Sequence, residues 1–386
     1  MKEVIVLGAA GTIGQVIVRD LVESGIEVIA ADIDFNRLEK LKKQLNVKNL
    51  EIYPLDIKNQ NETKQLLEQG KVCINATNYM FNIDVMQIAA AAKVDLLDLG
   101  GLYTMTKEQL KLDAMMKEAG VLSITGMGSD PGISNVLSRY GVDMMDEAEE
   151  IHIRYGSTSS GVTFPFAIDT VLDEATKNAM VVRNGQLYEI PPLSEEEDTI
   201  FNEQIGIQKT FSILHSELAT LPISFPTVKE ITYKDTWDLK TIEKIKLLDQ
   251  LGLLQNNQVN SIRKKLVSLL RESINEKPEW GKDELLVEVK GYKNGKKASI
   301  KLELLCDYQE KWGVNALAYV TSIPASIVAQ MLLKGEITEK GVKPPEQCIN
   351  PSKFLSYLTQ KNITLLSTYS ETVAVESDQY ESIIVK

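Results

Sequence analysis

A histidine, a serine and a glutamate stand next to one another at His215, Ser216 and Glu217, within a half-apolar segment of the chain. A histidine titrates near neutral pH, and a carboxylate beside it can take part in the same proton transfer. The chain has 2 histidines, and the other, His152, lies in an alternating pattern typical of an ordinary strand. His215 and Glu217 are therefore candidates for proton transfer, and a loop histidine with local hydrogen bonds is the alternative. No spacing of ligands in the sequence indicates a metal site.

Three glycines spaced three residues apart, Gly8, Gly11 and Gly14, connect the first apolar run to an amphipathic run. In a dinucleotide-binding unit the first glycine permits a tight turn, the second lets the backbone approach a pyrophosphate, and the third lets the helix lie against the strand. The N–H groups at the start of that helix, where Thr12 and Ile13 lie, then point at the phosphates. We predict a dinucleotide site here, and a glycine turn without a ligand is the alternative.

Carboxylates follow the next two strands, at the edge of the sheet where such units bind their ligands. Asp32 ends the second strand and can accept both ribose hydroxyls of NAD while repelling the 2′-phosphate of NADP. Arg37 lies close enough in the sequence to leave NADP open. Asp56 follows the third strand, where it can accept the adenine amino group or act as the N-cap of the next helix.

Small polar residues follow the fourth strand. Asn75, Ala76 and Thr77 lie there, on the predicted path of the nicotinamide half of the cofactor, and would leave room for it. A plain loop after a buried strand is the alternative. Tyr79, just beyond, either faces the substrate or covers the core.

A glycine-rich turn follows the sixth strand. Within it, Asp130 and Pro131 predict the N-cap and the first residue of a helix. The free N–H groups of that helix start would suit a substrate carboxylate. Gly132 lies in the turn and Asn135 lies one turn into the helix, so both are candidate substrate-binding residues. A capped helix that joins two domains is the alternative.

Residues 1–125 alternate short apolar runs with helical patterns, which predicts a parallel sheet with helices on both faces. Strands are expected at residues 4–7, 27–31, 50–53, 72–75, 96–99 and 121–125, and helices at about 13–23, 35–45, 60–69, 82–92 and 106–119. Beyond residue 150 the pattern changes to strand-like runs, two of which flank Asn294-Gly295, a strong signal for a hairpin. Residues 240–275 have a helical pattern.

These patterns predict an α/β chain with two domains. An N-terminal Rossmann-type domain, a doubly wound parallel sheet that binds NAD(P), is expected over residues 1–128, completed by the helical region 318–345. A second, α+β domain, built on a mostly antiparallel sheet, is expected over residues 129–317 for the substrate and for subunit contacts. Residues 346–386 are expected to form a C-terminal segment.

The composition of the 386-residue chain narrows the range of functions. Its 42 Lys and Arg against 54 Asp and Glu, a net charge of −12, argue against a nucleic-acid partner or an anionic membrane surface. We expect charged residues to break every apolar stretch well short of the about 20 residues that a membrane span needs. The first residues read as a core strand without a secretory signal, and the 3 cysteines lie far apart, so we expect a cytoplasmic protein.

The glycine turn and three further segments together resemble the saccharopine dehydrogenase-like family, and within it the lysine 6-dehydrogenases. The segments are Gly8–Gly14, Asp98–Gly101, Gly126–Asn135 and Gly341–Gln347, and the similarity runs over nearly the full length. The resemblance implies a Rossmann-type domain, an α/β substrate domain and a homodimer. It also implies oxidation or formation of C–N bonds in lysine-derived amino acids with NAD or NADP.

Three functions are open within that resemblance. An amine-oxidising dehydrogenase acting on lysine or saccharopine needs a base for the ammonium proton, and His215, Glu217 and then Asp130 are the candidates. The same site run backwards would condense an amino acid with an aldehyde, as the saccharopine- and carboxynorspermidine-forming relatives do. A nucleotide-binding regulatory protein without catalysis is the third. We expect NAD as the cofactor, with NADP as the other choice, a small amino-acid substrate and no metal.

Overall fold

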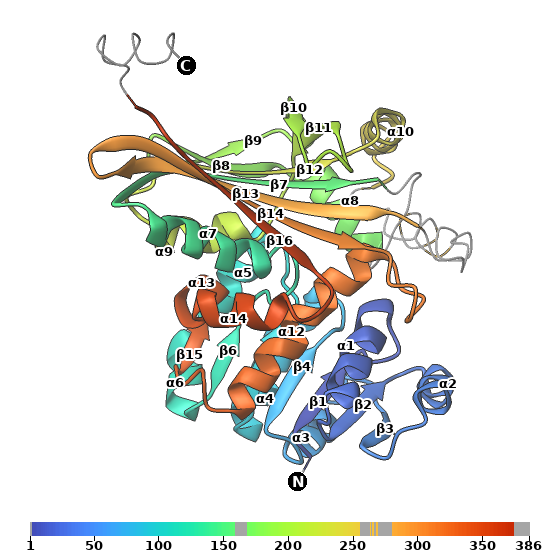
Figure 1. The fold of residues 1–386 in the computed structure, drawn as a ribbon. Coiled ribbons are helices and arrows are strands. Elements are labelled where there is room, and N and C mark those ends of the chain that lie inside the picture. Colours follow the sequence, from blue (N-terminus) through green and yellow to red (C-terminus); the bar gives the residue numbers. More distant parts are fainter. Residues whose placement is uncertain are drawn as a thin grey trace.

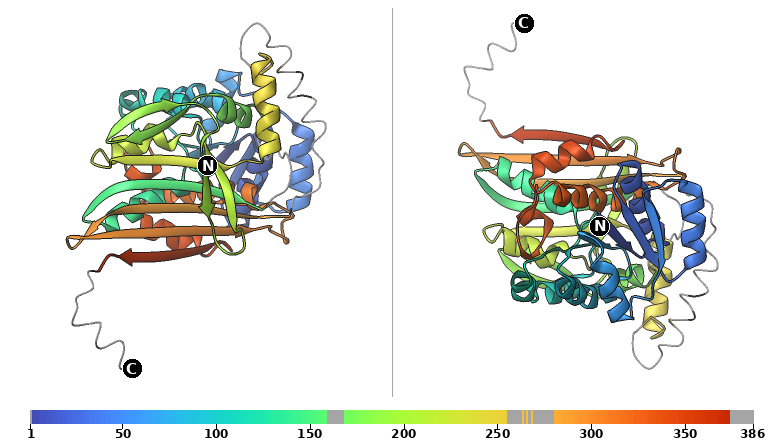
Figure 2. Two further views of the ribbon diagram at one scale, coloured as in Figure 1. Left: turned by 90° about the horizontal axis from the view of Figure 1, so that it is seen from above. Right: turned by 90° about the horizontal axis from the view of Figure 1, so that it is seen from below.

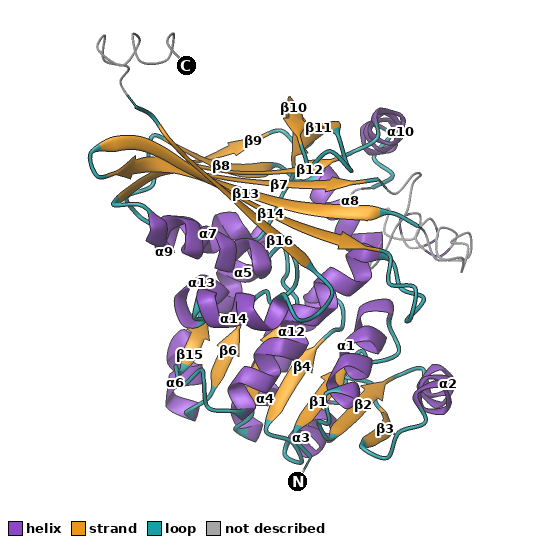
Figure 3. Cartoon of the chain, viewed as in Figure 1, coloured by secondary structure: helices purple, strands orange, loops and turns teal. Residues whose placement is uncertain are grey.

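Two β-sheets form the molecule, and helices lie on both faces of one sheet and beneath the other (Figure 1, Figure 3). The structure is a computed structural model that describes residues 2–158, 168–254 and 280–373, together with Arg263, Lys265 and Ser268. In Figure 1 the first sheet lies below the second, with helices α7 (Ile133–Met144) and α14 (Pro351–Leu358) between them.

The first sheet consists of parallel strands in the order β15-β6-β5-β4-β1-β2-β3. Its strands are β1 (Val4–Leu7), β2 (Val28–Asp32), β3 (Leu50–Pro54), β4 (Val72–Asn75), β5 (Asp95–Asp98), β6 (Leu122–Ile124) and β15 (Gly341–Lys343). In β1, Val4 and Val6 pack into the core on one face of the sheet, and Ile5 and Leu7 pack into the core on the other. A parallel sheet that is covered on both faces requires such continuously apolar strands, which is why the sequence pattern could identify them.

Helices of the N-terminal part lie close to their predicted places. They are α1 (Thr12–Glu23), α2 (Phe35–Leu45), α3 (Gln60–Leu67), α4 (Asn82–Ala92) and the short 3₁₀ helix η1 (Tyr79–Phe81). The single helix predicted over 106–119 is wrong, because the region forms two helices, α5 (Tyr103–Leu110) and α6 (Asp113–Ala119). The chain leaves helical geometry at Leu112, where φ is −85° and ψ is 5°.

Late segments of the chain complete the first sheet. β15 pairs with β6, and helix α12 (Ala316–Leu333) packs on α1. Ser326 Oγ donates a hydrogen bond to Asp20 Oδ2 at 2.6 Å, and Lys361 Nζ donates to Asp20 Oδ1 at 2.7 Å. One buried carboxylate of α1 therefore holds two late segments. The division of the chain into domains stays a prediction.

Helix α12 corrects the expectation about apolar stretches. No charged residue occurs between Lys311 and Lys334, so the chain does contain an uncharged stretch of membrane-spanning length. The 18 residues of α12 are long and apolar enough to cross a membrane, and 72% of them are buried inside the molecule. Their packing on α1 accounts for an apolar helix in the core.

The second sheet has the order β10-β11-β12-β7-β13-β14-β16, with β8 pairing with β12 and β9 pairing with β8. Its strands are β7 (Glu147–Ser157), β8 (Ala179–Arg183), β9 (Gln186–Ile190), β10 (Ser194–Ile200), β11 (Ile207–Ser212), β12 (Glu230–Thr236), β13 (Lys282–Lys293), β14 (Lys296–Asp307) and β16 (Thr364–Glu371). β7 pairs in parallel with β12, and the other pairs are antiparallel, so the prediction of a mostly antiparallel sheet is confirmed. Asn294 and Gly295 form the turn of the β13–β14 hairpin, as predicted, and β16 lies at an edge (Figure 2).

The inner face of the second sheet packs on helices and is strongly apolar. Ile151 and Ile153 of β7 and Val287 and Val289 of β13 are 0% exposed on this face. The other helices of this part are α8 (Ile168–Thr176), α9 (Glu217–Ser224), α10 (Leu239–Gln250) and α13 (Pro345–Cys348). Helix α10 confirms the start of the helical region predicted over 240–275. Most of that region beyond residue 254 lies outside the described residues, as do residues 374–386 of the predicted C-terminal segment.

We predict that Asp20→Ala lowers the free energy of unfolding by about 1–3 kcal/mol, because Ser326 and Lys361 lose a charged partner in the interior. Glu23→Ala on the same helix removes a surface pair with Arg19 and should cost less than about 1 kcal/mol. Urea unfolding of the two variants measures the difference. Equal losses would contradict the anchoring role of Asp20.

Candidate active site

The glycine turn after β1 is closed by backbone contacts that leave no space for side chains. A Cβ on Gly8, whose φ is +74°, would lie 2.6 Å from the carbonyl oxygen of Ala76 in the loop after β4. A Cβ on Gly14 would lie 2.2 Å from the carbonyl oxygen of Gly8. Real side chains do not tolerate such distances. The two glycines therefore let β1, α1 and the loop after β4 pack against one another, as their spacing predicts.

The start of α1 offers the free donors that a pyrophosphate needs. Gly11 is the N-cap residue and supplies no side-chain hydrogen bond. Within the described part of the chain, the amides of Thr12, Ile13 and Gly14 make no hydrogen bond. Free N–H groups and the positive end of the helix dipole bind phosphate at such positions. The turn therefore fits a dinucleotide.

Asp32 and Asp56 lie at the ends of β2 and β3. Asp32 Oδ2 accepts a hydrogen bond from the amide of Ala10 at 2.9 Å, so this carboxylate braces the glycine turn. Asp56 Oδ1 accepts from the amide of Lys58 at 3.0 Å, because a turn separates β3 from the next helix. Asn59 caps that helix, α3, so the N-cap alternative for Asp56 is wrong.

Asn75 organises the loop after β4 and is itself only 1% exposed. Its Oδ1 accepts from the amide of Thr77 at 3.2 Å and from the Thr77 hydroxyl at 2.6 Å, and its Nδ2 donates to Asn82 at 3.0 Å. A cofactor on the predicted path would therefore meet the backbone of this loop and not the Asn75 amide group. Tyr79 donates its hydroxyl hydrogen to Asp173 Oδ2 at 2.7 Å, which links η1 to α8.

The turn after β6 differs from the prediction. Helix α7 begins at Ile133 and not at Pro131, and its N-cap residue is Gly132, with φ +134°. The first two helical amides, those of Ile133 and Ser134, donate at 3.0 Å to carbonyls of the preceding turn. The N-cap role of Asp130 is therefore wrong, because the turn folds back and satisfies the helix start with its own backbone. These amides are also not free for a substrate carboxylate.

Asn135 is committed to the protein in the same way. Its Oδ1 accepts from the amide of Gly132 at 3.0 Å, and its Nδ2 donates to Thr220 at 3.2 Å and to Glu346 at 2.9 Å. The side chain is 1% exposed and ties α7 to α9 and α13. Asn135 and Gly132 thus bond to each other and to buried neighbours in this structure, and their predicted substrate contacts stay a prediction.

The three predicted catalytic residues do come together, in one chain of contacts. His215 Nδ1 pairs with Glu217 Oε2, and Glu217 Oε1 accepts from Ser134 Oγ at 2.7 Å. The His215 ring stacks on Tyr233 with 3.9 Å between ring centroids and 4° between ring planes. Tyr233 in turn donates its hydroxyl hydrogen to Asp130 Oδ2. We call the chain Asp130–Tyr233–His215–Glu217 the polar relay.

Charges within the polar relay set the protonation of its members. Burial lowers the pKa of His215, but the charge of Glu217 and its hydrogen bond outweigh burial and raise this pKa to about 10. Burial raises the pKa of Asp130 to about 6; Glu217 adds to the shift, and His215 and Tyr233 oppose it. At neutral pH His215 is therefore an imidazolium, and Asp130 can exchange a proton near neutrality.

The sequence reasoning missed Tyr233, Asp235 and Glu174. Tyr233 and Asp235 are two residues apart in β12 and share the inward face of that strand. Glu174 lies near the end of α8 and is 8% exposed. Burial raises the pKa of Glu174 to about 8, and burial also raises the pKa of Asp235. The alternation around Tyr233 could have indicated its inward position, whereas no local pattern marks Glu174.

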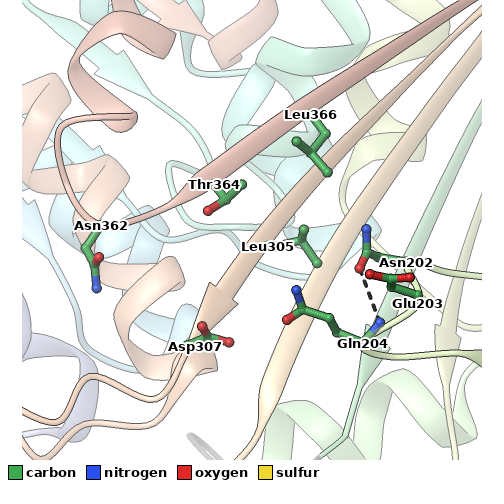
Figure 4. A pocket seen from close by; sticks show the side chains of 8 residues that line it. All are labelled: Asn202, Glu203, Gln204, Leu305, Asp307, Asn362, Thr364 and Leu366. Carbon is green, nitrogen blue, oxygen red and sulfur yellow. Dashed lines mark hydrogen bonds between the residues drawn. The ribbon is translucent and has the colours of Figure 1, made fainter.

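A surface hollow of about 380 Å³ lies apart from the polar relay (Figure 4). It is lined by Asn202, Glu203, Gln204, Leu305, Asp307, Asn362, Thr364 and Leu366. The hydrogen bond drawn there, from the Gln204 amide to Asn202 Oδ1, belongs to the turn between β10 and β11. The hollow contains no residue of the polar relay or of the glycine turn.

We predict that Gly8→Ala weakens nicotinamide-cofactor binding at least about tenfold, because the new Cβ would displace the loop that carries Ala76 and strain a backbone at positive φ. Gly25→Ala is the matched control, since Gly25 has φ +83° but nothing within 4 Å of its Cβ position. Titration of reduced cofactor by fluorescence gives both dissociation constants. A similar loss in both variants would attribute the effect to backbone strain alone.

Comparison with known proteins identifies the family. A model described as the saccharopine dehydrogenase NADP binding domain matches residues 4–124, and one described as the saccharopine dehydrogenase C-terminal domain matches residues 128–363. A solved saccharopine dehydrogenase (L-Glu forming) from Saccharomyces cerevisiae has a TM-score of 0.76 and 16% identity, covering 96% of this chain and 100% of that chain. This likeness shows the fold.

Two relatives with described activities match most of the chain. A carboxyaminopropylagmatine dehydrogenase from Synechocystis sp. is 22% identical over 387 residues, covering 94% of this chain and 96% of the relative. A carboxynorspermidine synthase from Vibrio alginolyticus is 24% identical over 349 residues, covering 82% of this chain and 84% of the relative. The predicted family and fold class are confirmed; the finer likeness to lysine 6-dehydrogenases stays a prediction. The chain therefore belongs to the saccharopine dehydrogenase family, as an oxidoreductase with a domain that binds a nicotinamide cofactor.

Proposed function

We propose that this oxidoreductase forms the C–N bond of a carboxylate-bearing secondary amine by reductive condensation of an amine with an aldehyde. The observation that carries the proposal is the polar relay, which ends in Asp130 after β6, at the carboxyl edge of the first sheet. The names of the carboxyaminopropylagmatine and carboxynorspermidine relatives support this direction. Oxidation of lysine or of a lysine-derived amino acid is the second candidate, since the same site would catalyse both directions.

Asp130 is the proton carrier in this proposal. The nicotinamide cofactor, when bound at the glycine turn, would supply the hydride for reduction of the C=N carbon. Condensation requires an acid that protonates the departing oxygen, and Asp130, with a pKa of about 6, holds that proton at slightly acid pH. In the reverse direction the ionised Asp130 accepts the proton of the amine. Asp130 as a residue is half-buried, which leaves it within reach of a substrate in this proposal.

His215 and Glu217 act as positioning residues in this proposal. Glu217 is 0% exposed, and its two oxygens are occupied by His215 and Ser134. His215 carries a proton that its pKa of about 10 retains at neutral pH. The imidazolium supports the Tyr233 ring and stabilises ionised Asp130. Asp130, the last of the predicted bases, thus takes the role first expected of His215.

For the cofactor we propose NAD, with NADP as the second choice. Asp32 is held at the end of β2 by the amides of Ala10 and Asp34, both at 2.9 Å, in the position expected for the ribose. A fixed carboxylate there favours two ribose hydroxyls over a 2′-phosphate. The description of the matching family model, an NADP binding domain, supports the second choice. A cytoplasmic location and a homodimer stay predictions.

One assay with several arms tests the function. The protein is incubated with reduced NAD or NADP, an amino-acid semialdehyde and a primary amine, and loss of reduced-nicotinamide absorbance is followed. The oxidative arms contain oxidised cofactor with lysine or saccharopine. Turnover in the first arms supports condensation, and turnover only with lysine or saccharopine supports the second candidate. Cofactor binding without turnover in any arm would rule out both reactions and favour a nucleotide-binding protein without catalysis.

We predict that Tyr233→Phe shifts the pH dependence of turnover while keeping the ring that stacks on His215. In the oxidative direction activity should rise with pH as Asp130 ionises, with a midpoint near its pKa of about 6. Removal of the Tyr233 hydroxyl removes a hydrogen bond that favours ionised Asp130, so the midpoint should move to higher pH by about one unit.

Tyr357→Phe serves as the control, because the Tyr357 hydroxyl bonds to Glu336 in another part of the molecule. Its pH profile should match that of the unsubstituted protein. A Tyr233→Phe profile with an unchanged midpoint would remove Asp130 from the role of proton carrier.

A further inference from the structure

A further buried carboxylate lies at the carboxyl edge of the first sheet, outside the polar relay. Asp98 is the last residue of β5 and is 1% exposed. In the sequence it precedes the paired glycines Gly100 and Gly101, and the proposed function leaves this segment without a role. A carboxylate is costly in the interior unless its oxygens are occupied, so the partners of Asp98 show what it holds in place.

Both carboxylate oxygens of Asp98 accept hydrogen bonds. Oδ1 accepts from the amide of Gly100 at 2.8 Å and from the amide of Gly126 at 2.9 Å. Oδ2 accepts from Gln109 Nε2 at 2.6 Å, which orients the carboxylate from helix α5. The backbone carbonyl of Asp98 also accepts from the amide of Met127 at 2.7 Å. Asp98 therefore joins the loop after β5 to the start of the turn after β6.

Gly100 and Gly126 form a seat for the ring of Pro131. A Cβ on Gly100 would lie 2.7 Å from Pro131 Cγ, and a Cβ on Gly126 would lie 2.6 Å from the same atom. The φ angles of the two glycines are +103° and +77°, so the backbone conformation and the close packing both require glycine. One oxygen of Asp98 thus holds, through two amides, the two residues on which the Pro131 ring packs.

The seat of Pro131 determines where Asp130 lies, because the two residues are adjacent in the chain. Tyr233 holds the Asp130 carboxylate from the second sheet. Asp98 holds the same turn from the first sheet. We propose that Asp98 is a positioning residue, which fixes the Pro131 seat so that the Asp130 carboxylate meets the Tyr233 hydroxyl and the substrate at a defined place.

This inference rests on the proposed function, in which Asp130 carries the proton. A proton carrier must lie within hydrogen-bond reach of the atom that it protonates. A displacement of about 1 Å can reduce turnover about a hundredfold. The cofactor phosphates, in contrast, are expected at the start of α1, after another strand of the sheet. Loss of the Asp98 acceptors should therefore reduce turnover far more than it reduces cofactor binding.

Strand β5 offers a matched control, because a second aspartate lies at its other end. Asp95 Oδ1 accepts from the amide of Leu122 at 2.7 Å and from Lys340 Nζ at 3.2 Å. Leu122 is the first residue of β6, so Asp95 also ties β5 to β6. It does so at the amino ends of these strands, away from Asp130. Asp95→Ala should therefore lower stability without displacing the turn after β6.

Steady-state kinetics of the variants test the inference, in whichever arm of the assay above shows turnover. Asp98→Ala should reduce kcat about tenfold to a hundredfold and leave the cofactor Kd within about twofold. Asp98→Asn keeps one oxygen for the two glycine amides and should recover most of the lost turnover. In that variant Gln109 can offer its Oε1, which has no hydrogen bond within the described residues, to the new amide group. Asp95→Ala should keep kcat within about twofold.

The pH dependence of turnover provides a readout that a loss of stability alone does not move. In the oxidative direction the midpoint of Asp98→Ala should lie at higher pH, as expected for Tyr233→Phe, because a displaced Asp130 carboxylate loses the hydrogen bond of the Tyr233 hydroxyl. Since both changes remove the same bond, the double variant should shift no further than Tyr233→Phe alone. Additive shifts would contradict the inference.

Hydrogen exchange measured by mass spectrometry needs no turnover. The peptide of residues 125–135 should exchange at least about tenfold faster in Asp98→Ala, because the amides of Gly126 and Met127 lose firm partners. Gln109→Met, a milder change that removes one support of the carboxylate, should act in the same direction and severalfold. Asp98→Asn and Asp95→Ala should leave the exchange of this peptide unchanged.

Unchanged exchange in both Asp98→Ala and Gln109→Met would overturn the inference. An equal loss of kcat in Asp95→Ala and Asp98→Ala would overturn it as well, since general destabilisation would then explain both. Failure of Asp98→Asn to recover turnover would also count against it, because charge and not hydrogen bonding would then matter. Faster exchange of the turn in Asp98→Ala, in a protein without turnover in any arm, would uphold Asp98 as the support of Asp130 and reject the proposed reaction.

Discussion

The buried ion pair of Glu217 and His215 is the interaction on which the candidate site depends. Glu217 has no exposed surface, and a carboxylate in such a place persists only when its oxygens are occupied. Ser134 of α7 occupies one oxygen and His215 the other. The pair fixes the plane of the His215 ring, the ring supports Tyr233, and the Tyr233 hydroxyl orients Asp130. One buried carboxylate thereby controls the position of a group at the far end of the polar relay.

The two halves of the site use opposite charges. The nucleotide half offers backbone N–H groups at the start of α1, which suit the negative pyrophosphate. The half where the proposed amine would react contains carboxylates from the turn after β6, from α8 and from β12. Tyr79 connects the halves, because it follows the loop after β4 and bonds to Asp173 in α8. A cofactor and an amine would thus meet between the first sheet and the second.

The expectations for Asp130 and Asn135 fell short for one common reason. Asp130 before Pro131 has the composition of a helix cap, and Asn135 has the spacing of a residue that reaches past a helix start. Both expectations treat the turn as an isolated segment. In the folded chain, carbonyls of the turn accept the first amides of α7, and Asn135 donates hydrogen bonds to α9 and α13. The hydroxyl of Tyr233, from a distant strand, donates a hydrogen bond to the Asp130 carboxylate. The N-cap alternative for Asp56 is wrong for a similar reason, since a turn places Asn59 at the cap.

The sequence by itself determined the features that depend on local backbone geometry and periodicity. The close approach of Gly14 to Gly8, the apolar strands of the first sheet and the Asn294–Gly295 hairpin all follow from residues near one another in the chain. The pair of His215 and Glu217 was also visible in the sequence, because only Ser216 separates the two residues. Only the tertiary structure decided which distant acids surround that pair. Asp130 comes from the turn after β6, Glu174 from α8 and Asp235 from β12, and only the fold brings these acids close enough for their charges to influence one another.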